Sequence, residues 1–114
     1  MTDYRTSGKT TLTPDVLLTI ARMAALGVDG VKSMAPVKGG MGGLFRRGNE
    51  GVRMLIEDSV VMVDLFLILS SDVNIREVSQ TVQQTVARAI SEMTGLEVGH
   101  VNIHIEDIDY SSEA

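Results

Sequence analysis

The stretch that most constrains the fold is VVMVDLFLIL, residues 60–69, in which Asp64 is the only charged residue. A strand that is apolar on both faces is typical of the centre of a sheet, where both faces are at least partly covered. The stretch before it, VRMLIE, is separated from it by Asp58 and Ser59 alone. A two-residue link between two such runs predicts a tight hairpin.

Two other stretches have helical spacing. Thr13 is a suitable N-cap before an apolar stretch with repeats of three and four, and Gly27 offers a stop. Asn74 opens a second helix, with Glu77 completing a pattern like a capping box, and Gly95 ends it. We therefore expect one helix before the glycine-rich stretch and a longer one after the central strand.

Three more strands complete the predicted fold. They are KTTL at residues 9–12, GVKSM at residues 30–34, and a long strand over about residues 96–108 that alternates apolar and polar side chains. The predicted order is β-α-β-β-β-α-β. This order predicts an α+β fold, a single two-layer sandwich with two helices on one face of a mixed sheet.

The 114 residues suffice for one domain. We expect a flexible N-terminus at residues 1–7, the α+β domain at residues 8–108 and an acidic tail at residues 109–114. The chain contains no cysteine, which removes disulfides and thiolate chemistry. The first residues lack the apolar segment of a secretory signal, and no apolar run is long enough to cross a bilayer. The expected location is the cytoplasm, with any membrane association made through a partner.

The charge is unevenly distributed. The net charge is −5, which makes a nucleic-acid partner unlikely on electrostatic grounds. Residues 1–57 hold eight Lys or Arg and five Asp or Glu, whereas residues 58–114 hold two and ten. This asymmetry is compatible with electrostatic matching between copies or with solubilising acids at strand and tail ends.

A glycine-rich stretch, PVKGGMGGLFRRGNEG, spans residues 36–51. It lacks the spacing of a dinucleotide-binding or phosphate-binding loop. We interpret it as a connection between strands whose apolar side chains pack on a neighbouring surface and whose basic side chains could meet an anion. The residues assigned to this accessory loop are Lys38, Met41, Leu44, Phe45, Arg46 and Arg47.

No catalytic, cofactor-binding or metal-binding residues are predicted. His100 and His104 lie four residues apart on a predicted strand, roughly 13 Å, which is too far for two ligands of one zinc ion. Asp64 interrupts the apolar run, and a buried carboxylate is costly unless it is paired. It could be a site acid, one partner of an interface ion pair, or a partly exposed residue on the sheet face opposite the helices.

That opposite face is the strongest functional signal in the chain. If alternate residues of the central strand face the helices, the others form an apolar patch, and exposed patches of this kind usually mark association. The expected interface residues are Met54, Ile56, Met62, Asp64, Phe66 and Ile68. On this interpretation Phe66→Asp is expected to lower the oligomeric state without unfolding the monomer.

The second half of the chain resembles the alkaline shock protein family of bacterial envelope-stress proteins. The shared features are Gly51-Val52 opening a strand, Asp64-Leu65 in the long strand, the helix centred on Gln83, and the segments Met93-Thr94-Gly95-Leu96 and Val101-Asn102-Ile103. The first helix and the GVDGV that follows it fit the N-terminal half of the family. Two features depart from the family pattern: Ser70-Ser71-Asp72 replaces a Tyr-Gly type of turn, and the tail lacks an obvious membrane-binding extension.

The resemblance implies a small, non-enzymatic cytoplasmic protein that self-associates and is linked to cell-envelope homeostasis. Members are often held at the membrane by a separate anchor protein, so the expected partners are other copies of the chain and a membrane-anchored protein, without direct membrane insertion. An alternative is a regulatory binder of an anionic ligand, a lipid-metabolism intermediate or RNA, through the glycine-rich loop. A third is an enzyme that uses Asp64 as a general base.

Overall fold

The computed structural model describes residues 12–36 and 51–110. Its elements are α1 (Pro14–Leu26), β1 (Val31–Met34), β2 (Val52–Glu57), β3 (Val60–Ser70), α2 (Ile75–Thr94) and β4 (Glu97–Asp109). The predicted α+β class and the order of elements from the first helix onward are confirmed. The strand predicted at residues 9–12 falls mostly outside the described residues, and Leu12 itself is not in a strand.

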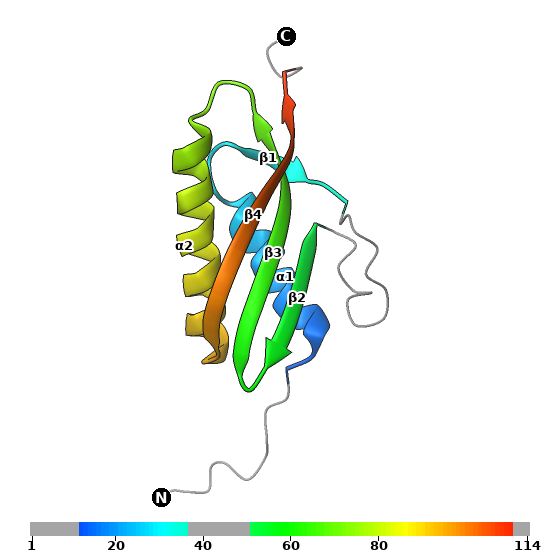
Figure 1. Ribbon diagram of the computed structural model, residues 1–114, viewed down its shortest axis with the longest axis vertical. Helices are drawn as coiled ribbons and strands as arrows, with labels where there is room; N and C mark the ends of the chain where they lie inside the picture. The colour runs from blue at the N-terminus through cyan, green and yellow to red at the C-terminus, as the bar shows by residue number, and fades with distance from the viewer. Residues whose placement is uncertain (1–11, 37–50, 111–114) are drawn as a thin grey trace, which may run out of the picture.

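The long apolar strand β3 is the centre of the sheet, as predicted (Figure 1). On one edge it pairs antiparallel with β2 along residues 60–65 and with β1 along residues 67–69. On the other edge it pairs in parallel with β4 from Val60 to Ser70. The sheet is therefore mixed.

Both helices begin and end as the sequence indicates. The Thr13 side chain accepts a hydrogen bond from the Val16 amide at the start of α1, and the Asn74 side chain accepts one from the Glu77 amide at the start of α2. Gly95 ends α2 in the left-handed conformation, with φ of 79°.

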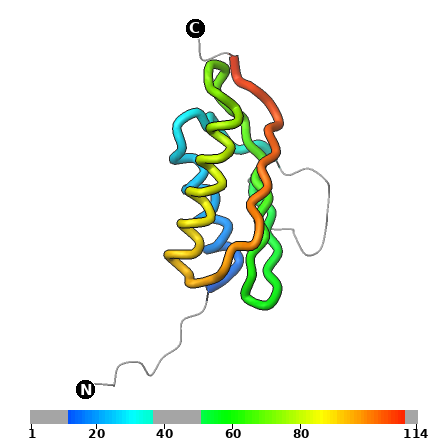
Figure 2. Tube along the Cα trace, turned by 60° about the vertical axis from the view of Figure 1, so that its left-hand side comes forward, coloured from blue at the N-terminus to red at the C-terminus, as the bar shows by residue number. Residues whose placement is uncertain are grey.

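The core lies between the sheet and the two helices, which cover the same face of the sheet (Figure 2). Alternate side chains of β3 point into it because successive residues of a strand face opposite sides. Its central members are all buried: Val61, Val63, Leu65, Leu67 and Leu69 from β3; Leu17, Ala21 and Ala25 from α1; and Val78, Val82, Val86 and Ile90 from α2. No described helix covers the other face, which we call the outer sheet face.

The hairpin between β2 and β3 corrects one prediction. Asp58 and Ser59 have φ of 52° and 67°, as a two-residue type I′ turn requires, and the turn pairs Glu57 with Val60. The same register pairs Met54 with Val63 and Ile56 with Val61.

The placement of Met54 and Ile56 on the outer sheet face is therefore wrong. Directly paired residues share a face, so both lie on the helix side, and Met54 packs against the core. Across a two-residue turn, each even-numbered residue of one strand pairs with an odd-numbered residue of the other. Arg53 and Leu55 therefore pair with Asp64 and Met62 and lie on the outer sheet face.

Candidate functional site

The outer sheet face carries an apolar surface formed by β2 and β3, beside which β4 presents polar side chains, among them His100 opposite Met62. β3 supplies Val60, Met62 and Ile68, which are all half-buried, and β2 supplies Leu55 beside Met62. Of the predicted interface residues, Met62, Asp64, Phe66 and Ile68 lie on this face because they alternate with the buried core positions of β3.

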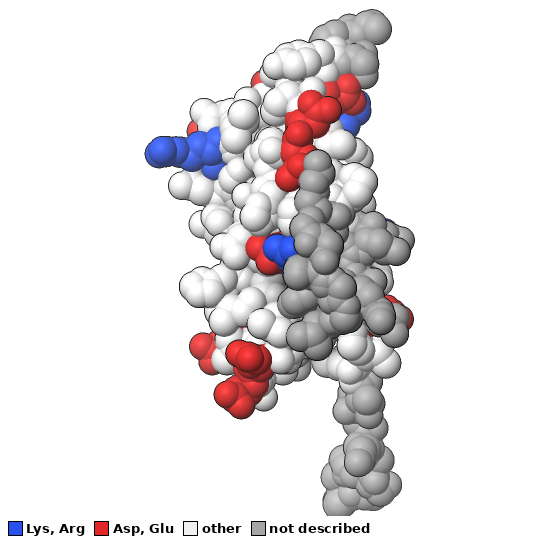
Figure 3. All heavy atoms as spheres, turned by 45° about the vertical axis from the view of Figure 1, so that its right-hand side comes forward, with Lys and Arg blue, Asp and Glu red and all other residues white. Residues whose placement is uncertain are grey.

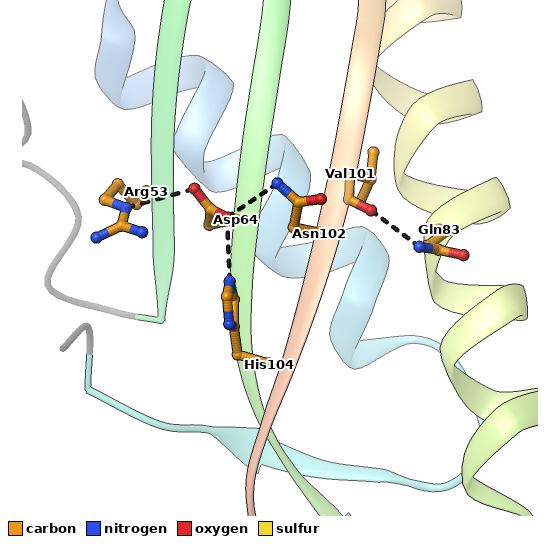
Figure 4. Close-up of polar contacts among 6 residues, drawn as sticks. All are labelled: Arg53, Asp64, Gln83, Val101, Asn102 and His104. Atoms are coloured by element: carbon orange, nitrogen blue, oxygen red, sulfur yellow. Dashed lines mark hydrogen bonds and ion pairs between the residues drawn. The ribbon is translucent and has the colours of Figure 1, made fainter. Parts of the chain in front are cut away.

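A polar cluster lies in the middle of this apolar surface. We call it the Asp64 cluster; its members are Asp64, Arg53, Asn102 and His104 (Figure 4). Arg53 of β2 and Asn102 of β4 lie directly opposite Asp64 in the ladder, so the three strands each contribute one side chain to a row. His104 lies two residues after Asn102 on β4, opposite Phe66.

Asp64 accepts hydrogen bonds from all three partners. The distances are 3.0 Å from His104 Nε2, 3.2 Å from Asn102 Nδ2 and 3.4 Å from Arg53 Nε. Because an ionised carboxylate only accepts, the imidazole must carry its proton on Nε2. The Asp64 side chain keeps 23% of its surface exposed, so the cluster is neither deeply buried nor fully solvated.

The partners keep Asp64 ionised. Partial burial raises the pKa of its carboxyl group, but the hydrogen bonds from His104 and Asn102 and the positive charge of Arg53 together outweigh this effect. The pKa of Asp64 therefore lies below its ordinary value of 3.8. A carboxylate held in this state is a weak proton acceptor at neutral pH, which disfavours a role as general base.

Phe66 connects the cluster to the apolar surface. Its ring stacks on His104 with 4.5 Å between the ring centroids and 10° between the planes, and Arg53 Cζ lies 5.4 Å from the ring centroid. Phe66 is only 4% exposed although it does not belong to the core between the sheet and the helices. Phe66 is thus a buried residue of the outer sheet face, whereas the side chains of Met62 and Ile68 are more exposed to solvent.

The charge distribution also singles out this surface. Figure 3 shows a view in which most of the described surface is uncharged and one acidic and one basic group touch near the middle. Acidic groups lie towards the lower end, and both acidic and basic groups lie towards the upper end. Glu57 and Asp58 lie at the hairpin end of the sheet, and Asp107 and Asp109 lie at the far end of β4. Such an arrangement suits an apolar contact framed by charges.

Four further residues belong to this surface although they are not among the predicted interface residues: Arg53, Leu55, Asn102 and His104. Counting residues through the two-residue hairpin turn identifies Arg53 and Leu55 from the sequence. The positions of Asn102 and His104 depend on a parallel pairing of β4 with β3 that has two register shifts. The accessory loop residues, Lys38, Met41, Leu44, Phe45, Arg46 and Arg47, lie outside the described residues. Within the described part of the chain, no three His, Asp or Glu side chains are grouped closely enough to hold a metal ion.

Comparison with known proteins decides the family. Residues 2–110 match the family model of the alkaline shock proteins, which is described as having a cell envelope-related function. The chain belongs to the alkaline shock protein family. The resemblance expected from the sequence is thereby confirmed.

The similar proteins carry no stated activity. The chain is 31% identical to the uncharacterized protein YqhY of Bacillus subtilis over 110 residues, which cover 94% of this chain and 82% of that protein. It is 32% identical to the uncharacterized protein Spy1535 of Streptococcus pyogenes over 104 residues, 89% of this chain and 79% of that protein. No solved structure matches the chain.

Membership of the alkaline shock protein family links the chain to the cell envelope. In residues 12–36 and 51–110, neither helix is long and apolar enough to span a membrane.

Proposed function

We propose that this member of the alkaline shock protein family is a non-enzymatic scaffold of the cell envelope. It acts in the cytoplasm by binding other copies of itself and a membrane-linked partner. The outer sheet face is the contact surface on this proposal. The observation that carries it is the half-buried apolar surface around the Asp64 cluster, which no described helix covers.

The chemistry of the surface supports binding rather than catalysis. Asp64 is satisfied by three donors and held ionised, and the residues before and after it on the same face of β3 are Met62 and Phe66. A satisfied polar group inside an apolar contact adds specificity because only a partner that leaves its hydrogen bonds intact, or replaces them, can approach.

Substitution at Met62 tests the surface. Met62 is half-buried at the centre of the outer sheet face, so Met62→Asp is expected to introduce a charge into the contact while leaving the core intact. Light scattering coupled to size-exclusion chromatography should show a lower mass for the variant than for the wild type at the same concentration.

Met93→Asp is the matched control. Met93 lies on α2 and is 68% exposed, so it receives the same change of residue on the opposite layer of the molecule. The proposal requires that Met93→Asp keep the wild-type mass. If both variants associate as the wild type does, the outer sheet face is not the contact surface.

A further inference from the structure

The two helices differ in what they present on the side away from the core. α2 exposes mainly polar and charged side chains along its length, with exposed apolar residues only at Ile75 and Met93 near its ends. α1 has just two charged residues among its thirteen, Asp15 and Arg22. A helix that is apolar on nearly all sides is normally covered on more than one side.

The exposed apolar side chains of α1 form a line. Val16, Met23 and Leu26 are 43%, 63% and 40% exposed, and the exposed Thr19 lies between the first two. The spacing of positions 16, 19, 23 and 26 is three, four and three, which keeps these residues on one side of a helix. We call these four residues the α1 outer stripe.

The α1 outer stripe lies opposite the buried side of the same helix. Leu17, Ala21 and Ala25 face the core. At 100° per residue around the helix axis, the mean direction of these three side chains is about 180° from that of the stripe. The stripe therefore cannot be covered by the sheet or by the core side of α2. Its three–four spacing is the pattern by which two helices pack along a shared seam.

We propose that the α1 outer stripe packs antiparallel against the same stripe of a second copy. This inference rests on the proposed self-association and gives it a second surface, on the helical layer. Placing Val16 opposite Thr19 of the second copy also places Met23 opposite Leu12, which is 38% exposed just before the helix. Val16, Thr19 and Met23 then each meet a side chain of the stripe or Leu12, whereas Leu26 lies opposite position 9, outside the described residues.

Charge favours a second copy of the chain as the occupant. Asp15 and Arg22 flank the stripe on the same side and are one heptad apart. In the antiparallel register, Asp15 of each copy lies beside Arg22 of the other, so two pairs of opposite charge frame the seam. A parallel register gives neither charge an opposite partner. Both side chains also have interactions within their own chain, and the pairing between copies follows from their positions and signs.

Cysteine cross-linking tests the register because the wild-type chain has no cysteine. Each single-cysteine variant can therefore form only bonds between copies. An oxidised mixture of Val16→Cys and Thr19→Cys, distinguished by a size tag, is expected to form the mixed disulfide. Met23→Cys alone is expected to stay unlinked because its two copies are offset by eleven residues, about 16 Å along the helix, beyond the roughly 7 Å reach of a disulfide.

The outcomes separate the alternatives. Efficient linkage of Met23→Cys to itself would indicate a parallel seam, and no linkage in the Val16→Cys and Thr19→Cys mixture would show that the stripe does not meet itself; either result overturns the proposal. Coverage of the stripe by another segment of its own chain would also give no linkage, and so would occupancy by a different protein.

A mass measurement keeps this inference separable from the proposed function. Met23→Asp is expected to weaken association about tenfold, while Met93→Asp leaves it unchanged. If Met23→Asp has no effect while Met62→Asp lowers the mass, the α1 contact is wrong and the outer sheet face stands. The reverse pattern would support the α1 contact and remove the sheet face from the proposed function.

Discussion

The Nε2 atom of His104 lies 3.0 Å from Oδ1 of Asp64, although the two residues are 40 positions apart in the chain. Parallel pairing of β4 with β3 brings them together, and the stacking of His104 on Phe66 holds the imidazole in place. This contact places a paired charge on the outer sheet face, between the apolar residues Met62 and Phe66 of β3. It determines several properties that can be measured.

Asp64 should contribute to acid sensitivity. Its pKa is lowered in the folded protein, so the unfolded chain binds its proton more readily. The contribution to stability is therefore complete above the ordinary pKa of 3.8 and is lost as pH falls through the folded pKa. We expect Asp64→Asn to lower the free energy of unfolding by about 1–2 kcal/mol at pH 7. Denaturant titrations should show that this difference shrinks below pH 3.8.

Asp29→Asn is the control for this titration because Asp29 lies exposed in the turn after α1. It should leave the unfolding free energy nearly unchanged at pH 7. A gap between wild type and Asp64→Asn that stays constant through strong acid would contradict the hydrogen-bonded, ionised state of Asp64.

Phe66 should be important for folding of the monomer. Since its side chain is 4% exposed, Phe66→Ala is expected to cost about 3 kcal/mol of unfolding free energy, and Phe66→Asp should cost more. This replaces the expectation that Phe66→Asp lowers the oligomeric state of an intact monomer. Tyr110→Ala, at an aromatic residue that is 70% exposed, should change stability by less than about 0.5 kcal/mol in the same denaturant titration. Equal effects of the two alanine substitutions would show that Phe66 is not buried in solution.

Gly51 should tolerate no side chain. It has φ of 85°, and a Cβ built there would lie 2.6 Å from Met34 Cβ and 2.9 Å from the Ala35 carbonyl oxygen. Gly51→Ala is therefore expected to destabilise the fold by about 2–4 kcal/mol through both backbone strain and overlap. Gly95, with φ of 79°, would meet nothing within 4 Å, so Gly95→Ala should cost only the strain, about 1–2 kcal/mol. Thermal unfolding of both variants gives the comparison, and a greater loss at Gly95 would contradict the close approach at Gly51.

The sequence was sufficient to predict the architecture because its local signals agree with one another. The capping residues Thr13 and Asn74, the two-residue turn and the apolar run of β3 each specify a local structure, and all fit one two-layer fold. The residues that form the outer sheet face were predicted less well than the fold. The register of a hairpin decides which side of the sheet each β2 residue faces, and the two-residue turn puts Met54 and Ile56 on the helix side and not on the predicted outer face.

The partners of Asp64 illustrate a harder problem. Arg53 could have been found from the hairpin, since it lies directly opposite Asp64. Asn102 and His104 depend on where β4 pairs with β3 after a 20-residue helix, and on shifts in that pairing. A helical crossover indicates that β4 lies beside β3, but the register between the two strands is set by side-chain packing. The sequence therefore showed His104 only as a polar residue on a strand.

The central claim is that the chain associates through its apolar surfaces. The direct measurement is the mass of the wild-type protein by light scattering over a concentration series at low salt and at about 1 M salt, where charge interactions between exposed groups are largely screened. We predict a mass that rises with concentration at both salt levels. A monomer at every concentration would contradict the account, and association that disappears at high salt would assign it to the uneven charge of the chain rather than to the outer sheet face.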